Sequence, residues 1–305
     1  MKNLTRQNPR QLIVAQELIN KVIKLNYSVA ELRIMAKVII SPYIFYNTWE
    51  RCISDWYAGR PMGTWTDPNT IPLLNNIALG TKSSDYIPEP WWGNDNIEID
   101  LHSVVINFNP GQGENIQHRN VMPYHDDYAK DIVHSGVLPK TDKWHKNRRA
   151  LPILNALKRI GVLPGNYIPS LDNHLSVELI PWHTHNIGTA SGFPGYLRAN
   201  ILNVYEYAIC FAAHESKRIS NDKLKNKVIL KLSGSTTAMI LNLLNGIGYR
   251  SVVYPQQTVP GTRSHCLEFT INRLPGIRFF SIWGSTSRND FPSGKDMDYI
   301  LNNFF

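Results

Sequence analysis

Residues 104–113, VVINFNPGQG, carry the strongest signal for the fold. They begin as an apolar, β-branched run and then change to Asn109, Pro110 and Gly111, which are turn formers. This change predicts a buried strand within residues 101–108 that ends in a sharp turn. Three similar segments follow along the chain: LSVELI (175–180), NKVILKLSG (226–234) and IRFFSIWG (277–284).

Helical segments separate these four predicted strands. One helix is expected from Pro152 to just before Gly161, and a second over residues 198–215, which are rich in Ala, Tyr and Leu. Strands that alternate with helices are typical of a parallel sheet. We therefore expect an α/β fold with a central, mostly parallel four-stranded sheet flanked by helices. Ligands of such sheets bind beyond the carboxyl ends of the strands, so the four strand-end loops are the expected site.

The N-terminal region differs from the rest of the chain. Residues 9–25 have the spacing of an amphipathic helix, and Ser28 with Glu31 forms a capping-box pattern for another. A Pro- and Gly-rich stretch follows, and residues 87–93 are expected to be extended. We therefore expect a helical extension over residues 1–95, packed on an α/β domain over residues 96–305.

The composition limits the class of protein. Lys and Arg number 32 against 24 Asp and Glu, a formal net charge of +8, which suits a polyanionic partner. Three widely spaced Cys argue against a disulfide framework and a four-Cys metal site. The sequence shows neither a signal-peptide pattern nor an apolar run that could span a bilayer. We expect a cytoplasmic monomer with no cofactor, no metal and no membrane partner.

The Asn109-Pro110-Gly111 turn after an apolar strand resembles the first motif of a DNA-repair family. It is similar to the mismatch-specific uracil/thymine branch of the uracil-DNA glycosylase superfamily. The resemblance implies an enzyme that flips a nucleotide out of damaged or modified DNA, single- or double-stranded, and hydrolyses its base–sugar bond. It implies that Asn109 positions the attacking water. The base pocket would be formed by Phe108, Pro110, Gly111, Gln112, Trp182, His183 and Trp283.

The segment IWGSTSRNDFP (282–292) resembles the second motif of the same family. There a Ser-rich loop after the last strand pinches the DNA backbone, and Arg288 is placed to fill the gap left by a flipped base. The chain departs from the family at Trp283 and Gly284, where a polar residue or Met is usually followed by Pro. The start of the helix after the third strand and a basic run before residue 150 are further candidates for DNA contact. The residues expected to bind DNA are Ser285, Thr286, Ser287, Arg288, Ser235, Thr236, Lys146, Arg148 and Arg149.

The resemblance also suggests a class of substrate. In the uracil-specific branch a Tyr at the position of Gly111 blocks any 5-substituent, whereas glycine leaves room. We therefore expect excision of a 5-substituted or bulky modified pyrimidine, such as a modified cytosine of phage DNA, with a role in antiphage defence. No Asp or Glu stands out in the strand-end motifs as a strong base, so catalysis is expected to rest on a water oriented by Asn109 and on electrostatics.

Each motif also has a purely structural interpretation. Asn-Pro-Gly is a common turn, Ser-Thr-Ser caps helices, and basic runs are often solvated loops. The pair His183 and His185 fits a base or phosphate contact better than a metal site, and Trp91 and Trp92 fit either base stacking or core packing. Two other functions stay open: a non-catalytic nucleic-acid-binding relative, which Trp283 favours, and a hydrolase of free nucleosides or nucleotides.

Overall fold

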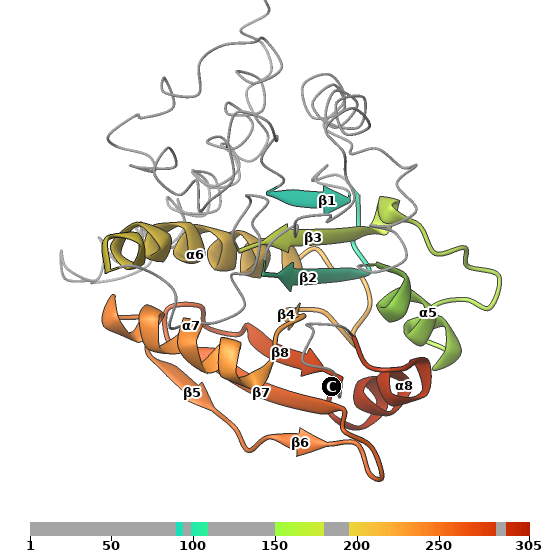
Figure 1. Ribbon diagram of the computed structural model, residues 1–305. Helices are drawn as coiled ribbons and strands as arrows, with labels where there is room; N and C mark the ends of the chain where they lie inside the picture. The colour runs from blue at the N-terminus through green and yellow to red at the C-terminus, as the bar shows by residue number, and fades with distance from the viewer. Residues whose placement is uncertain (1–89, 94–98, 109–149, 180–194, 285–290) are drawn as a thin grey trace, which may run out of the picture.

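A mixed eight-stranded sheet with helices on both sides forms the centre of the molecule (Figure 1). The computed structural model describes residues 90–93, 99–108, 150–179, 195–284 and 291–305. The strand order is β1-β3-β2-β4-β8-β7-β5, and β6 pairs with β7. The expected α/β class is confirmed.

Four neighbouring strands make a parallel core within this sheet. They are β3 (His174–Glu178), β2 (Ser103–Asn107), β4 (Lys227–Leu230) and β8 (Arg278–Trp283). The β2–β3, β2–β4 and β4–β8 pairs are all parallel. Each coincides with one of the segments predicted as strands, apart from β3, which begins one residue before its predicted segment, so the prediction of these four strands is confirmed. Their apolar, β-branched runs suit strands that are covered on both faces.

The number of strands and the extent of parallel pairing were predicted wrongly. β1 (Trp91–Gly93) pairs antiparallel with β3, and β7 (His265–Ile271) pairs antiparallel with β8. β5 (Ser251–Val253) and β6 (Gln257–Thr258) pair antiparallel with β7. Strands of two or three residues are too short to show a period in the sequence, so β1, β5 and β6 gave no signal.

Four α-helices of the described residues cover the sheet. They are α5 (Leu151–Arg159), α6 (Gly195–Ser216), α7 (Gly234–Gly246) and α8 (Gly294–Asn303), and a short 3-10 helix, η5 (Leu171–Asn173), precedes β3. α5 and α6 correspond to the helices predicted before residue 161 and over residues 198–215, and both are confirmed. α6 contacts α7 and α5 contacts α8, and Figure 1 shows these two pairs on opposite sides of the sheet. No helix in the described ranges has the length and apolar character needed to cross a membrane.

Local sequence explains where these helices start and stop. Pro152 stands in the first turn of α5, and Gly161 follows its end with φ +78°, a conformation that glycine adopts without strain. The Ser233 side chain caps α7 by accepting a hydrogen bond from the Thr236 N–H, and Ser293 caps α8 in the same way. The helix predicted to start at Ser235–Thr237 thus begins one residue earlier, at Gly234.

The parallel strands divide their side chains between two faces of the sheet, because successive residues of a strand alternate. On the face covered by α6 and α7, Trp91 contacts Phe211 of α6, and Ser281 bonds to Thr237 of α7. On the face covered by α5 and α8, Phe280 stacks on Phe305, which follows α8. We call these the α6/α7 face and the α5/α8 face.

The strand β1 joins the end of the expected N-terminal extension to the main sheet. Its last residue, Gly93, has φ +97°, and a Cβ there would lie 1.9 Å from the backbone oxygen of His174, so only glycine fits. Trp91 and Trp92 are fully buried, which supports core packing rather than base stacking. Residues 1–89 lie outside the described part, so the helical extension and its boundary at residue 95 stay predictions.

Candidate active site

The order of the parallel strands marks one place at the edge of the sheet. After β2 the chain adds β3 on one side and then returns to add β4 on the other. In open α/β sheets this change of direction leaves a crevice at the carboxyl ends of the strands, where ligands bind. Here the crevice lies beyond β2 and β4, so it adjoins Phe108, directly after β2, and Ser233, at the start of α7.

Two groups of predicted site residues meet next to this place. Trp283, at the carboxyl end of β8, lies against the first residue of α7, because a Cβ on Gly234 would be 3.1 Å from the Trp283 Cη2 atom. Ser235 and Thr236 follow directly in the first turn of that helix. The structure therefore brings Trp283 to the helix start that was expected to contact DNA.

The hydroxyl groups at the start of α7 form a small cluster. The Ser233 Oγ lies 3.1 Å from the Ser235 Oγ and 2.9 Å from the Thr236 Oγ1, and it accepts a hydrogen bond from the Thr236 N–H. Capping therefore occupies part of this cluster, as its structural interpretation expects. Ser235 is nonetheless exposed at the positive end of the helix, where a phosphate would be favoured.

The sequence analysis missed a histidine that packs on Trp283. The His265 and Trp283 rings are 5.2 Å apart, because the two residues face each other in the β7–β8 pair. The His265 Nδ1 lies 3.0 Å from both the Gln256 Nε2 and the Thr258 Oγ1. The sequence could not predict that His265 contacts Trp283, because the contact depends on the register of the antiparallel β7–β8 pair, which was not predicted.

The carboxyl ends of β2 and β3 carry a buried polar pair. The Asn107 Nδ2 donates a hydrogen bond of 3.2 Å to the Glu178 Oε1, and Asn107 and Glu178 are 6% and 0% exposed. Glu178 was not among the residues predicted for the site, and the expectation that no strand-end carboxylate acts as a strong base stays a prediction. A signal was present in LSVELI, where Glu178 interrupts an otherwise apolar strand.

The same face of β3 is polar along its whole length. His174 and Ser176 precede Glu178 at alternate positions, and all three side chains are fully buried on the α5/α8 face. The His174 ring nitrogens lie 2.8 Å from the Ser103 Oγ and 2.8 Å from the Ser176 Oγ. Both nitrogens are thus engaged, so His174 holds β2 and β3 in register rather than offering a free base.

Among the predicted pocket residues, Phe108 is buried at the end of β2 and Trp283 is half-buried. The structure describes no group of three His, Cys, Asp or Glu side chains that could hold a metal ion in the ranges given above. Several predicted site residues lie outside the described ranges, and their roles stay predictions: Asn109, Pro110, Gly111, Gln112, Trp182, His183, Ser285, Thr286, Ser287, Arg288, Lys146, Arg148 and Arg149.

Comparisons of the chain with protein-family models, with curated proteins and with solved structures give no match. The chemistry at the carboxyl ends of the parallel strands is therefore the basis for a functional proposal.

Proposed function

We propose that the protein is a DNA glycosylase of the uracil-DNA glycosylase type that flips a modified pyrimidine out of DNA and hydrolyses its base–sugar bond. One observation carries the proposal. The four strands whose ends lead into the resembling motifs are neighbours and parallel. Their carboxyl ends therefore meet at one edge of the sheet, which is where a single active site needs them.

The reaction needs water, a leaving base and a stabilised sugar cation. Flipping the nucleotide out of the stack costs a few kcal/mol, and less for a damaged or unpaired base. The C1′–N bond then breaks with its electron pair going to the base, and the sugar passes through an oxocarbenium-like state. A water positioned by Asn109 forms the new C1′–O bond. It loses one proton and the departing base gains one, so the products are the free base and an abasic site.

Contacts at the helix start and the net charge favour DNA as the substrate. Ser235 is exposed at the amino end of α7 and directly follows Gly234, which lies against Trp283. Its position suits a backbone phosphate, which would fix the register of the DNA. The formal net charge of +8 would add sequence-independent attraction to the polyanion.

The proposed substrate is a 5-substituted pyrimidine, including a bulky modified cytosine of phage DNA, and the proposed role is antiphage defence. Support comes from Gly111, which stands where uracil-specific enzymes carry a blocking Tyr. If Gly111 makes this room, Gly111→Tyr should abolish excision of bulky bases. Unchanged excision of bulky bases by that variant would refute the pocket argument.

The experiment is a strand-break assay on DNA that contains uracil, a thymine mismatch, 5-hydroxymethylcytosine or its glucosylated form, followed by alkali. Asn109→Ala should lose at least about 100-fold in rate, since removal of one positioned polar group in a site typically costs that much. The matched control is Asn272→Ala, an exposed asparagine in the turn after β7. DNA binding without strand breaks on any substrate would favour the non-catalytic relative. Hydrolysis of free nucleosides only would favour the third alternative.

A further inference from the structure

Trp283 has a different setting from the other two tryptophans that the structure describes. Trp91 and Trp92 are fully buried, whereas Trp283, at the carboxyl end of β8, is half-buried. The half-buried His265 ring packs beside it, with 5.2 Å between the ring centroids and 33° between the ring planes. These two residues, which we call the aromatic pair, therefore present part of an aromatic surface at the edge of the sheet where the parallel strands end.

The neighbouring elements hold the aromatic pair in place. A Cβ on Gly234 would lie 3.1 Å from the Trp283 Cη2, so the indole packs directly on the start of α7. The buried hydroxyl groups of Thr237 and Ser281 lie 2.6 Å apart and link α7 to β8 two residues before Trp283. An aromatic surface on two linked elements loses little conformational entropy when a flat ligand stacks on it.

The hydrogen bonds of His265 determine which of its ring nitrogens donates. The Gln256 Nε2 can only donate, so it donates its 3.0 Å hydrogen bond to the His265 Nδ1. The Thr258 hydroxyl lies at the same distance from this nitrogen and can donate as well. The neutral ring therefore carries its proton on Nε2, for which the described residues provide no hydrogen-bond partner. His265 thus presents an N–H donor beside the aromatic surface.

An aromatic surface with a donor at its side suits a nucleobase. Every base has a flat π-face that stacks on such rings, and a pyrimidine also has carbonyl oxygens at its edge that accept hydrogen bonds. The base must be unpaired, because its neighbours cover both of its faces in a duplex. The polar side chains nearest the aromatic pair, Gln256, Thr258 and Ser235, are neutral, which suits a base better than a charged group.

We infer that the aromatic pair binds one unpaired pyrimidine of a DNA strand, which stacks on Trp283 and accepts a hydrogen bond from the His265 Nε2. Gln256 is the positioning residue that keeps the ring proton on this nitrogen. This assignment rests on the proposed glycosylase function and adds His265 and Gln256 to the same site as specificity residues. They select an unpaired base with a carbonyl oxygen and form no bond in the hydrolysis.

The test compares the dissociation constants of two single-stranded ligands, a short oligothymidylate and an abasic strand of the same length. Trp283→Leu should weaken binding of the oligothymidylate by about 5- to 150-fold, which is the typical loss for one stacked base. The same variant should change binding of the abasic strand by less than about twofold. A smaller fraction of folded protein would weaken both ligands equally, so the ratio of the two dissociation constants reports stacking alone.

Three further variants separate stacking from the hydrogen bond. Trp283→Phe keeps an aromatic ring and should retain most of the preference for the oligothymidylate. His265→Phe keeps a ring beside Trp283 but removes the donor, so the preference should fall by about 2- to 10-fold, as expected for one hydrogen bond. The matched control is Tyr299→Leu, at a 37% exposed tyrosine of α8, which should leave the preference unchanged.

An unchanged preference in Trp283→Leu would overturn the inference, and an unchanged preference in His265→Phe would overturn the role of His265. The proposed function is tested separately by base release. If wild type prefers the oligothymidylate but releases no base from any DNA, the proposed function is refuted and the stacking site stands. If wild type releases a base but binds both strands equally, the stacking site is refuted and the proposed function stands.

Discussion

At the scale of single residues, the position of Trp283 depends on the absence of a side chain at Gly234. The indole fills the space that a Cβ would take, and the His265 ring packs on it 5.2 Å away. Trp283 is therefore held between a helix start and an aromatic neighbour. A group held in this way on two rigid elements is positioned more precisely than one on a loop, which suits a wall of a base pocket.

Gly234→Val should displace Trp283, because even a Cβ at 3.1 Å from the ring requires the neighbour to shift. If the indole lines the pocket, base release should fall by roughly 10- to 100-fold, as expected when a positioning contact moves by about 1 Å. The matched control is Gly246→Val at the far end of α7, where no atom lies within 4 Å of the added Cβ. Equal rates for both variants would show that Trp283 is not part of the pocket.

His102 should make the fold sensitive to acid. Burial lowers the pKa of His102 below its usual value of 6.5, and the nearby Asp100 carboxylate opposes this only in part. The unfolded chain therefore binds more protons than the native state as the pH falls through about 6.5, so the free energy of unfolding decreases there. Between about pH 7.5 and pH 5, the free energy of unfolding measured with urea should decrease less for His102→Gln than for wild type. Identical losses would contradict a role for His102.

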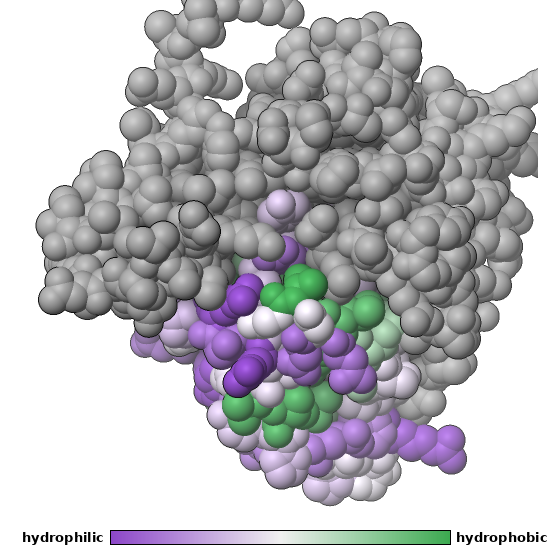
Figure 2. Space-filling view, turned by 90° about the vertical axis from the view of Figure 1, so that its left-hand side faces the viewer, coloured by the Kyte–Doolittle hydropathy of each residue, from purple (hydrophilic) through white to green (hydrophobic). Residues whose placement is uncertain are grey.

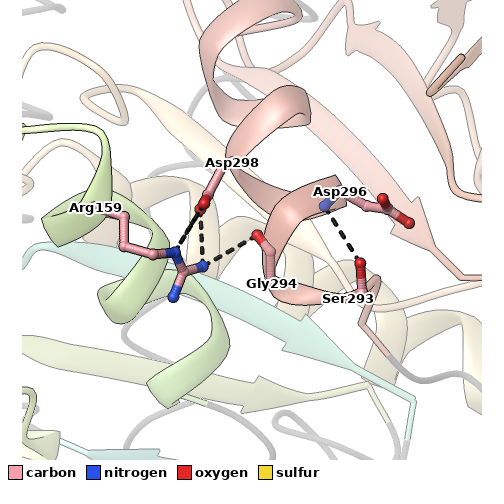
Figure 3. A network of polar contacts seen from close by, with 5 residues as sticks. All are labelled: Arg159, Ser293, Gly294, Asp296 and Asp298. Carbon is pink, nitrogen blue, oxygen red and sulfur yellow. Dashed lines mark hydrogen bonds and ion pairs between the residues drawn. The ribbon is translucent and has the colours of Figure 1, made fainter.

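At the scale of elements, α5 and α8 are joined by one arginine on the α5/α8 face. Figure 3 shows the Arg159 side chain, near the end of α5, reaching the start of α8. Its Nε donates to the Asp298 Oδ2 at 2.8 Å, and its Nη2 donates to the Asp298 Oδ1 at 2.8 Å and to the Gly294 backbone oxygen at 3.1 Å. The hydrogen bond to Asp298 raises the pKa of Arg159 above its usual value, so the guanidinium stays charged.

Arg159→Lys should destabilise the protein by about 0.5–1 kcal/mol, because lysine keeps the charge but loses the two-pronged geometry. The Arg159 side chain is 44% exposed, so salt should screen part of its contribution. Urea unfolding at low and high salt measures both effects. The control is Arg250→Lys, at an exposed arginine before β5, which should leave the free energy of unfolding unchanged. A loss as small as that of the control would mean that packing alone joins the two helices.

The elements predicted from the sequence share one property. Each contains a hydrophobic run or boundary residues that can be recognised in the sequence. β2, β3, β4 and β8 are apolar runs bounded by turns, and α5 has Pro152 at its start and Gly161 after its end. Contacts that depend on register could not be predicted in the same way. Glu178 was visible in the sequence, but its bond to Asn107 follows only from the β2–β3 alignment. The contact between His265 and Trp283 likewise needs the β7–β8 pairing.

At the scale of the whole molecule, the described sheet has an exposed edge strand, β5, that is separate from the strand ends proposed as the active site. Figure 2 shows the side on which α7 and β5 lie, where hydrophobic residues are bordered by hydrophilic ones. Val252 and Val253 of β5 are 60% and 49% exposed. β5 is only three residues long and Pro255 follows soon after, which limits pairing with another sheet edge. The exposed strand is thus compatible with the expected monomer, which stays a prediction.

The central claim concerns the whole molecule: the edge where the four parallel strands end hydrolyses a base–sugar bond in DNA. The most direct measurement is mass spectrometry of both products after a single turnover in water labelled with heavy oxygen. The account predicts a free pyrimidine base, an intact DNA strand with one labelled oxygen at an abasic C1′, and neither product with Asn109→Ala. Absence of free base from every modified DNA, or release of a nucleoside or nucleotide in place of the base, would contradict it.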